Sequence, residues 1–176
     1  MFLAFAEISN KITFKMKKLI TVLLLAASVF AISCSSPSGA TGQTTSKKSV
    51  IGSWIMTDIS FEGIPEKAKV TVFDQASYEC FKGSQWVLPS NGKGSYILSS
   101  TAEGCSTATQ QIMWSLYKAG GTDQFQFKKL YDGVKPKNVA EGYRVAVTNN
   151  GNTMTWRATV NFEDKNAYII YTLQRR

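Results

Sequence analysis

Histidine is absent from this 176-residue sequence. Its absence excludes Ser-His-Asp and Cys-His catalysis, His-ligated zinc, haem held by a proximal histidine and a histidine pH switch. Long basic runs are also missing, because no stretch of Lys and Arg exceeds two residues and no nucleic-acid-binding motif is present. The sequence therefore predicts neither a histidine-dependent enzyme nor a nucleic-acid partner.

The composition fits one folded domain. Apolar residues make up 44% of the chain and aromatic residues 12%, against 18% charged residues. At this length the apolar content is enough for one hydrophobic core, and it is too high for an intrinsically disordered chain.

The N-terminal region has the pattern of a targeting signal. Residues Leu19 to Ser33 are apolar and uncharged, and they directly follow Lys17 and Lys18. This stretch is shorter than the roughly 18–20 residues that a transmembrane helix needs, and small residues follow its apolar centre. We therefore predict a signal peptide over residues 1–33, with translation starting at Met16. A membrane anchor that stays attached is the alternative.

The end of this segment, Ala31-Ile32-Ser33-Cys34, resembles the lipobox of bacterial lipoproteins. That family prefers leucine where this sequence has Ala31. The resemblance implies that Cys34 becomes the N-terminus of the mature protein and carries fatty acyl chains such as palmitate, which together anchor it to a membrane. A plain secretory signal with an incidental cysteine is the alternative.

Residues 34–49 are expected to form a lipidated, flexible tether. Positions 35–49 hold no aromatic or large aliphatic residue and are rich in Ser, Gly and Thr, so folded structure is expected from about Val50. Some Gram-negative lipoproteins have a surface-export signal, which is an acidic run after the lipidated cysteine. No acidic run follows Cys34 in this sequence. We therefore expect a location in the Gram-negative cell envelope, at the outer membrane and facing the periplasm. Without residues 1–33 the net charge is only +5, which mostly favours solubility.

The cysteine count predicts one disulfide. Of the three cysteines, Cys34 is assigned to the lipid, which leaves Cys80 and Cys105 as a pair in an oxidising compartment. Their bond is expected to stabilise the fold by about 3 kcal/mol. A redox role is disfavoured, because the chain has no C-x-x-C motif.

From residue 50 onward, short apolar runs alternate with period two between Gly- and Asn-containing turns. This pattern predicts an all-β domain over residues 50–176 with eight or nine antiparallel strands and at most one short helix. Short hairpin turns favour an up-and-down β-barrel, and a β-sandwich is the alternative. The expected strands are Val50–Ser60, Lys67–Phe73, Gln85–Leu88, Ser95–Leu98, Gln111–Tyr117, Gln124–Lys129, Tyr143–Thr148, Thr153–Val160 and Ala167–Leu173, with a helix or loop over Asp74–Lys82.

The tripeptide Gly52-Ser53-Trp54, at the start of the first strand, resembles the lipocalin G-x-W motif. The resemblance implies a lipocalin-like barrel in which Gly52 and Trp54 belong to the floor and Arg175 from the last strand lies across the indole. Residues 50–176 also look like the short lipocalin-like lipoproteins of Gram-negative bacteria. The Thr-Asp-Tyr turn motif of animal lipocalins is missing.

The leading functional prediction is a monomeric, non-enzymatic, lipid-anchored protein that holds a small, mostly apolar ligand in its barrel. The ligand-lining candidates are the inward-facing aromatic residues Trp114, Phe125, Phe127, Tyr143, Trp156 and Tyr171. The alternative is an envelope scaffold or protein-interaction module with a side-chain-filled barrel, contacting its partner through residues 61–69 and 132–138. An enzyme is disfavoured, because the carboxylates are scattered and no catalytic motif is present. The sequence predicts no metal and no cofactor.

Overall fold

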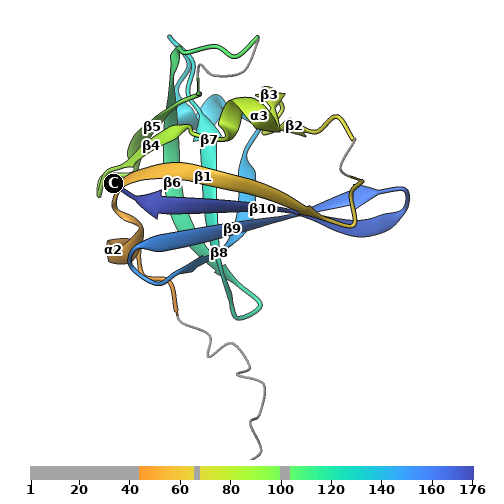
Figure 1. Ribbon diagram of the computed structural model, residues 1–176. Coiled ribbons are helices and arrows are strands. Elements are labelled where there is room, and N and C mark those ends of the chain that lie inside the picture. The colour runs from red at the N-terminus through yellow and green to blue at the C-terminus, as the bar shows by residue number, and fades with distance from the viewer. Residues whose placement is uncertain (1–43, 66–67, 100–103) are drawn as a thin grey trace, which may run out of the picture. The chain divides into compact units, whose positions relative to one another are not determined.

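Eight antiparallel strands form a closed barrel in the computed structural model (Figure 1). The structure describes residues 44–65, 68–99 and 104–176. Around the barrel each strand is hydrogen-bonded to its neighbours in sequence, and the last strand returns to the first. The barrel strands are β1 (Gly52–Glu62), β4 (Gln85–Leu88), β5 (Lys93–Ile97), β6 (Thr109–Ala119), β7 (Thr122–Lys129), β8 (Tyr143–Asn149), β9 (Thr153–Phe162) and β10 (Lys165–Arg175).

The pairing of β1 with β10 distinguishes the barrel from a sandwich. Their register runs from Trp54 opposite Arg175 to Glu62 opposite Tyr168, with one irregularity between Met56 and Asp58. Figure 1 shows these two strands side by side, β1 in orange and β10 in blue. Closure removes the exposed edges that both strands would have in a sandwich. The predicted all-β, up-and-down barrel is confirmed.

Alternation of side chains determines which residues form the core. In β10 every second residue from Ala167 to Leu173 is buried, and in β7 the buried positions are Phe125, Phe127 and Lys129. Successive side chains of a strand point to opposite faces, so the buried set of each strand lines the barrel interior. Lys129 differs from the other buried residues of β7 and β10, because its inward-facing side chain is charged.

The helices are short. The described residues contain two short α-helices, α2 (Lys47–Val50) and α3 (Tyr78–Phe81), where at most one was expected, and the 3₁₀ turn η1 (Pro136–Asn138). The additional helix, α2, begins where the hydroxyl of Ser46 accepts a hydrogen bond from the backbone N–H of Ser49. No helix in the part of the chain that the structure describes is long and apolar enough to cross a membrane.

The segment between β1 and β4 folds differently from the expected second barrel strand over Lys67–Phe73. Within it, β2 (Thr71–Val72) and β3 (Ala76–Ser77) pair only with each other, outside the barrel. The chain reverses between them because Phe73 and Asp74 have φ values of 50° and 45°, which end an extended strand. We call residues 63–65 and 68–84 the cap, and the barrel end that they cover the mouth.

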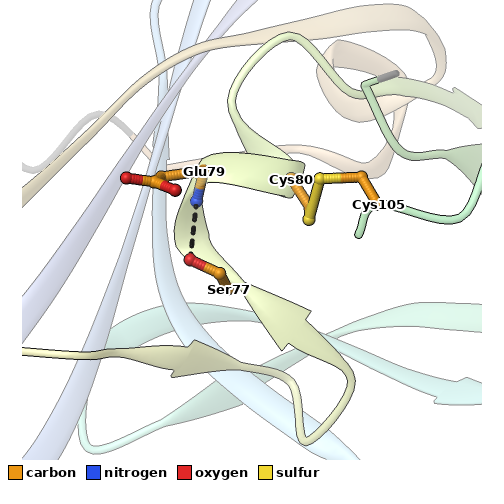
Figure 2. The surroundings of a disulfide bond; sticks show 4 residues. All are labelled: Ser77, Glu79, Cys80 and Cys105. Carbon is orange, nitrogen blue, oxygen red and sulfur yellow. Dashed lines mark hydrogen bonds between the residues drawn. A yellow bond between two sulfur atoms is a disulfide. The ribbon is translucent and has the colours of Figure 1, made fainter. Parts of the chain in front are cut away.

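The predicted disulfide between Cys80 and Cys105 is present (Figure 2). Cys80 lies in α3, and Cys105 lies four residues before β6. Figure 2 also shows how α3 begins: the hydroxyl of Ser77 accepts a hydrogen bond from the backbone N–H of Glu79. The bond therefore attaches the cap to the chain that leads into β6.

Candidate functional site

The floor, at the opposite end of the barrel from the mouth, is built around Trp54. This side chain is 1% exposed, and its indole N–H donates to the backbone carbonyl of Val50 at 2.8 Å. The guanidinium carbon of Arg175 lies 4.3 Å from the centroid of the Trp54 ring. The contact that the lipocalin resemblance implies is therefore present, and it is a cation–π contact between the first and last strands.

Arg175 also bonds three backbone carbonyls. Its Nε donates to Gly151, and its two terminal nitrogens donate to Ile51 and Ser49, at distances between 2.6 and 3.0 Å. Gly52 leaves room for this side chain, because a Cβ at that position would lie 2.5 Å from a guanidinium nitrogen of Arg175. The predicted floor residues thus share one structural arrangement, and its function is to close the barrel.

Folded structure begins earlier in the sequence than we predicted, because residues 44–49, which we assigned to the tether, pack against the floor. Thr45 is 5% exposed; its backbone N–H donates to the carboxylate of Asp123 and its hydroxyl to the carbonyl of Val147. Val50 is fully buried. Residues 44–49 therefore pack on the barrel because the backbone N–H and the hydroxyl of Thr45 both find partners there and Val50 covers the floor. The rest of the predicted tether, Cys34 and the predicted signal peptide lie outside the described residues.

The predicted ligand-lining residues lie inside the barrel and form one connected set of ring contacts. Five of the six are buried, and Tyr143 is half-buried. Phe125 stacks on Trp114 and on Trp156, with centroid separations of 5.8 and 4.5 Å. Contacts of Phe125 with Phe127, of Phe127 with Tyr143 and of Trp156 with Tyr171 complete the set. The structure therefore brings together all six candidates.

Phe73, a residue of the cap, occupies the mouth among these rings. It is 8% exposed and stacks on Tyr171 with a centroid separation of 5.3 Å and an interplanar angle of 18°. Its other ring contacts are edge-on, with centroids between 5.0 and 6.2 Å away. We call the five rings around it the aromatic cage: Phe81, Trp86, Phe127, Tyr143 and Tyr171. Sequence reasoning missed Phe73, because it read this residue as the end of a barrel strand.

Lys129 is the second residue that sequence reasoning missed. Its exposed fraction is 7%, and its ammonium donates to the backbone carbonyl of Phe73 at 3.0 Å. The same nitrogen lies 5.3 Å from the centroid of the Tyr143 ring. No carboxylate among the described residues lies within ion-pair distance of it. The alternation of Phe125, Phe127 and Lys129 along β7 was the available signal, since all three share one face.

Several interior polar groups are strongly shielded from solvent. The indole N–H groups of Trp114 and Trp156 are buried and make no hydrogen bond to a described residue, and the hydroxyl of Tyr143 is buried beside the Asp74 carboxylate. Burial raises the pKa of Tyr143 to about 12, and the nearby carboxylates of Asp74 and Glu141 add to the shift. Burial also raises the pKa of Tyr96, whose hydroxyl is hydrogen-bonded to the Gln75 side chain of the cap. These phenols are neutral over the physiological pH range, so they can donate hydrogen bonds.

Three carboxylates of the barrel strands make contacts that hold the structure together. Asp58 pairs with Lys82 at 2.8 Å, and Glu62 pairs with Arg157 at 2.6 Å. Asp123 accepts a hydrogen bond from the backbone N–H of Thr45. Within residues 44–65, 68–99 and 104–176, no cluster of three or more Cys, Asp or Glu side chains is arranged to hold a metal ion. The carboxylates of Asp58, Glu62 and Asp123 therefore hold separate parts of the chain together.

Comparison with family models, with curated proteins and with solved structures finds no match. The closed eight-stranded antiparallel barrel is compatible with a lipocalin-like fold. The function is therefore inferred from the mouth and its aromatic cage.

Proposed function

We propose that this protein is a lipid-anchored cell-envelope protein that binds a small, mostly apolar ligand in its barrel without chemical conversion. The observation that carries the proposal is the position of Phe73. Barrel strands and the Cys80-bearing helix supply the surrounding rings, but the ring at their centre comes from a hairpin of the cap. A chamber filled by a residue from outside the barrel is one that another apolar group of similar size can fill.

The barrel size supports this assignment. An eight-stranded barrel is just wide enough to be filled by its own side chains or to hold one small ligand. Below the mouth, the stack of Trp114, Phe125 and Trp156 fills this interior. At the mouth, the barrel strands leave space for one further ring. We therefore place the ligand at the level of Phe73, with the rings of Trp86, Phe127 and Tyr171 as its main contacts.

The proposed anchor is Cys34, in the outer membrane and facing the periplasm. Of the three cysteines in the sequence, Cys80 and Cys105 are bonded to each other, which leaves Cys34 as the remaining thiol. A structural disulfide of this kind is typical of an exported protein. The net charge without residues 1–33 is small, and we propose a monomer with no nucleic-acid partner.

Native mass spectrometry of the full-length protein, purified from its own membranes, tests the ligand proposal. The expected result is a small molecule that stays bound under gentle conditions and is lost when the barrel unfolds. A Phe73→Trp variant, which fills the chamber further, is the matched control and should retain less of that molecule. If both proteins carry only their covalent lipid, the scaffold interpretation with a filled barrel replaces the ligand proposal.

Phase separation in detergent tests the anchor. Cys34→Ala should move the protein from the detergent phase to the aqueous phase, because several acyl chains are needed for stable membrane attachment. Ser35→Ala, one position further on, is the control and should leave the partition unchanged. An unchanged partition of Cys34→Ala would contradict the lipoprotein proposal and leave the ligand proposal intact.

A further inference from the structure

We infer that the ligand of the mouth is an apolar carboxylic acid that replaces the Phe73 turn, with its hydrocarbon part in the aromatic cage and its carboxylate on Lys129. This inference rests on the proposed function and adds the charge of the ligand. Three features at one place support it: a buried ammonium group, a buried phenol and a strained turn that imitates the ligand.

The environment of Lys129 favours an anion. Taking an ammonium group out of water is unfavourable unless it gains an opposite charge or several hydrogen bonds. Lys129 has three donors, yet the described residues provide one carbonyl, that of Phe73, and the face of the Tyr143 ring. A carboxylate in place of that carbonyl would convert a neutral acceptor into an ion pair with charge-assisted hydrogen bonds, which are stronger than neutral ones.

The Phe73 turn has the same sequence of chemical groups as such an acid. Its ring lies in the aromatic cage, and its carbonyl oxygen accepts from Lys129 at 3.0 Å. The next residue, Asp74, has its carboxylate close enough to Tyr143 to raise the pKa of that phenol. An apolar ring followed by acceptor oxygens and a negative charge therefore already occupies the site. Asp74 belongs to the same turn, so its charge leaves the site together with the ring.

Tyr143 provides a second donor for the incoming carboxylate. Its hydroxyl is buried beside the Asp74 carboxylate of the turn, and the ammonium of Lys129 lies over its ring. When the turn withdraws, this buried donor loses that carboxylate, which is unfavourable unless another acceptor takes its place. Because a carboxylate has two oxygens, one can accept from Lys129 while the other accepts from Tyr143. A neutral alcohol offers one oxygen and no charge, so it satisfies this pair poorly.

The turn is built to be displaced. Phe73 and Asp74 both lie in the left-handed region of φ, which is unfavourable for a bulky residue such as phenylalanine. The disulfide holds the neighbouring α3 through Cys80, so the turn can withdraw without the rest of the cap leaving the barrel. Besides the ring contacts of Phe73 and its bond to Lys129, this movement breaks the hydrogen bond between the side chains of Gln75 and Tyr96.

A brominated pair of probes tests the inference: 3-(4-bromophenyl)propionate and the matching alcohol, 3-(4-bromophenyl)propan-1-ol. Bromine quenches tryptophan fluorescence at short range. All four tryptophans of the full-length chain lie within residues 54–156, so quenching reports binding inside the barrel rather than to the N-terminal segment. The titrations use the full-length wild type, Phe73→Ala, and Phe73→Ala combined with Lys129→Met. Lys128→Met in the same background is the matched control, because that lysine bonds the Val139 carbonyl instead.

The acid should bind Phe73→Ala at least about tenfold more tightly than it binds the wild type, because the turn no longer competes for the cage. In Phe73→Ala the acid should bind about tenfold or more tightly than the alcohol, as expected for hydrogen bonds to a charged group. Lys129→Met should remove this preference and leave the affinity for the alcohol unchanged, while Lys128→Met should alter neither. If Phe73→Ala loses its folded fluorescence, Phe73→Leu serves in its place.

The outcomes separate this inference from the proposed function. Equal binding of acid and alcohol, independent of Lys129, would overturn the assignment of a carboxylate and leave the apolar ligand site standing. Failure of both probes to quench any variant would overturn the ligand site and the inference together. Tight binding of the acid that survives Lys129→Met would place the carboxylate elsewhere and would also overturn the inference.

Discussion

The two ends of the barrel are closed by different kinds of contact. At the floor, Arg175 covers the Trp54 ring and bonds three backbone carbonyls of the chain around it. At the mouth, Phe73 is held mainly by contacts between rings and by one hydrogen bond to Lys129. Hydrogen bonds depend strongly on direction, whereas the stabilisation from apolar contact depends mainly on the area buried. The floor is therefore closed by directional contacts between the ends of the chain, and the mouth by the ring of a segment outside the barrel, which we propose a ligand can replace.

Among the changes at the floor, removal of the Trp54 ring should reduce the stability most. Trp54→Ala should lower the free energy of unfolding by about 3–5 kcal/mol, because a buried aromatic residue of this size leaves a large cavity. It also removes the hydrogen bond to Val50. Urea denaturation followed by circular dichroism measures the loss, with Trp54→Phe as the control that keeps a ring. A loss below about 1 kcal/mol would contradict the role of Trp54 at the floor.

Removing the disulfide tests the mouth. Cys80→Ala combined with Cys105→Ala should cost about 3 kcal/mol, because the unfolded chain loses the restraint on a loop of 25 residues. Hydrogen exchange should locate the loosening in the cap while β1 and β10 stay protected. Cys34→Ala is the control and should leave the stability unchanged. Equal loss of protection at both ends would show that the two closures are not independent.

Arg175→Ala should cost about 1–3 kcal/mol, less than Trp54→Ala, because it removes hydrogen bonds and a cation–π contact at an exposed position without opening a cavity. Arg176→Ala is the matched control at the neighbouring position. Within the described residues, the Arg176 guanidinium bonds one side chain, that of Gln85. Arg175→Lys should recover part of the loss. Thermal unfolding of the three variants gives the ranking, and an Arg176 effect equal to that of Arg175 would contradict the arrangement described for the floor.

The smallest expected effect concerns the backbone of the mouth. Phe73→Gly should be more stable than Phe73→Ala by about 1 kcal/mol, because only glycine adopts a φ of 50° without penalty. The same pair of substitutions at the exposed Val87 of β4 should give the opposite order, since glycine weakens a strand. Urea denaturation compares the four variants. If the glycine variant were the less stable one at Phe73 as well as at Val87, the strain assigned to the Phe73 turn would be contradicted.

Periodicity was enough to predict the barrel, and the cysteine count was enough to predict the disulfide. Alternation along β7, β9 and β10 identifies their inward faces. The floor was predicted from the resemblance of Gly52-Ser53-Trp54 to the lipocalin motif, and the shared parity of Leu173 and Arg175 agrees with it. The Phe73 turn was missed because tertiary packing overrides local preference there: a phenylalanine and an aspartate adopt left-handed backbone to bury one ring. Lys129 was missed because a charged residue at an inward position breaks the rule that the alternation relies on.

The contacts of Thr45 determine at which end of the barrel the described chain begins. Because Thr45 is bonded near the floor, at Asp123 and Val147, residues 44–50 lie at the end opposite the mouth. These residues therefore add a second layer of contacts to the end that Trp54 and Arg175 already close. Within the described residues the mouth is covered by the cap alone, so access to the barrel interior depends on one segment of about twenty residues, held by a single covalent bond.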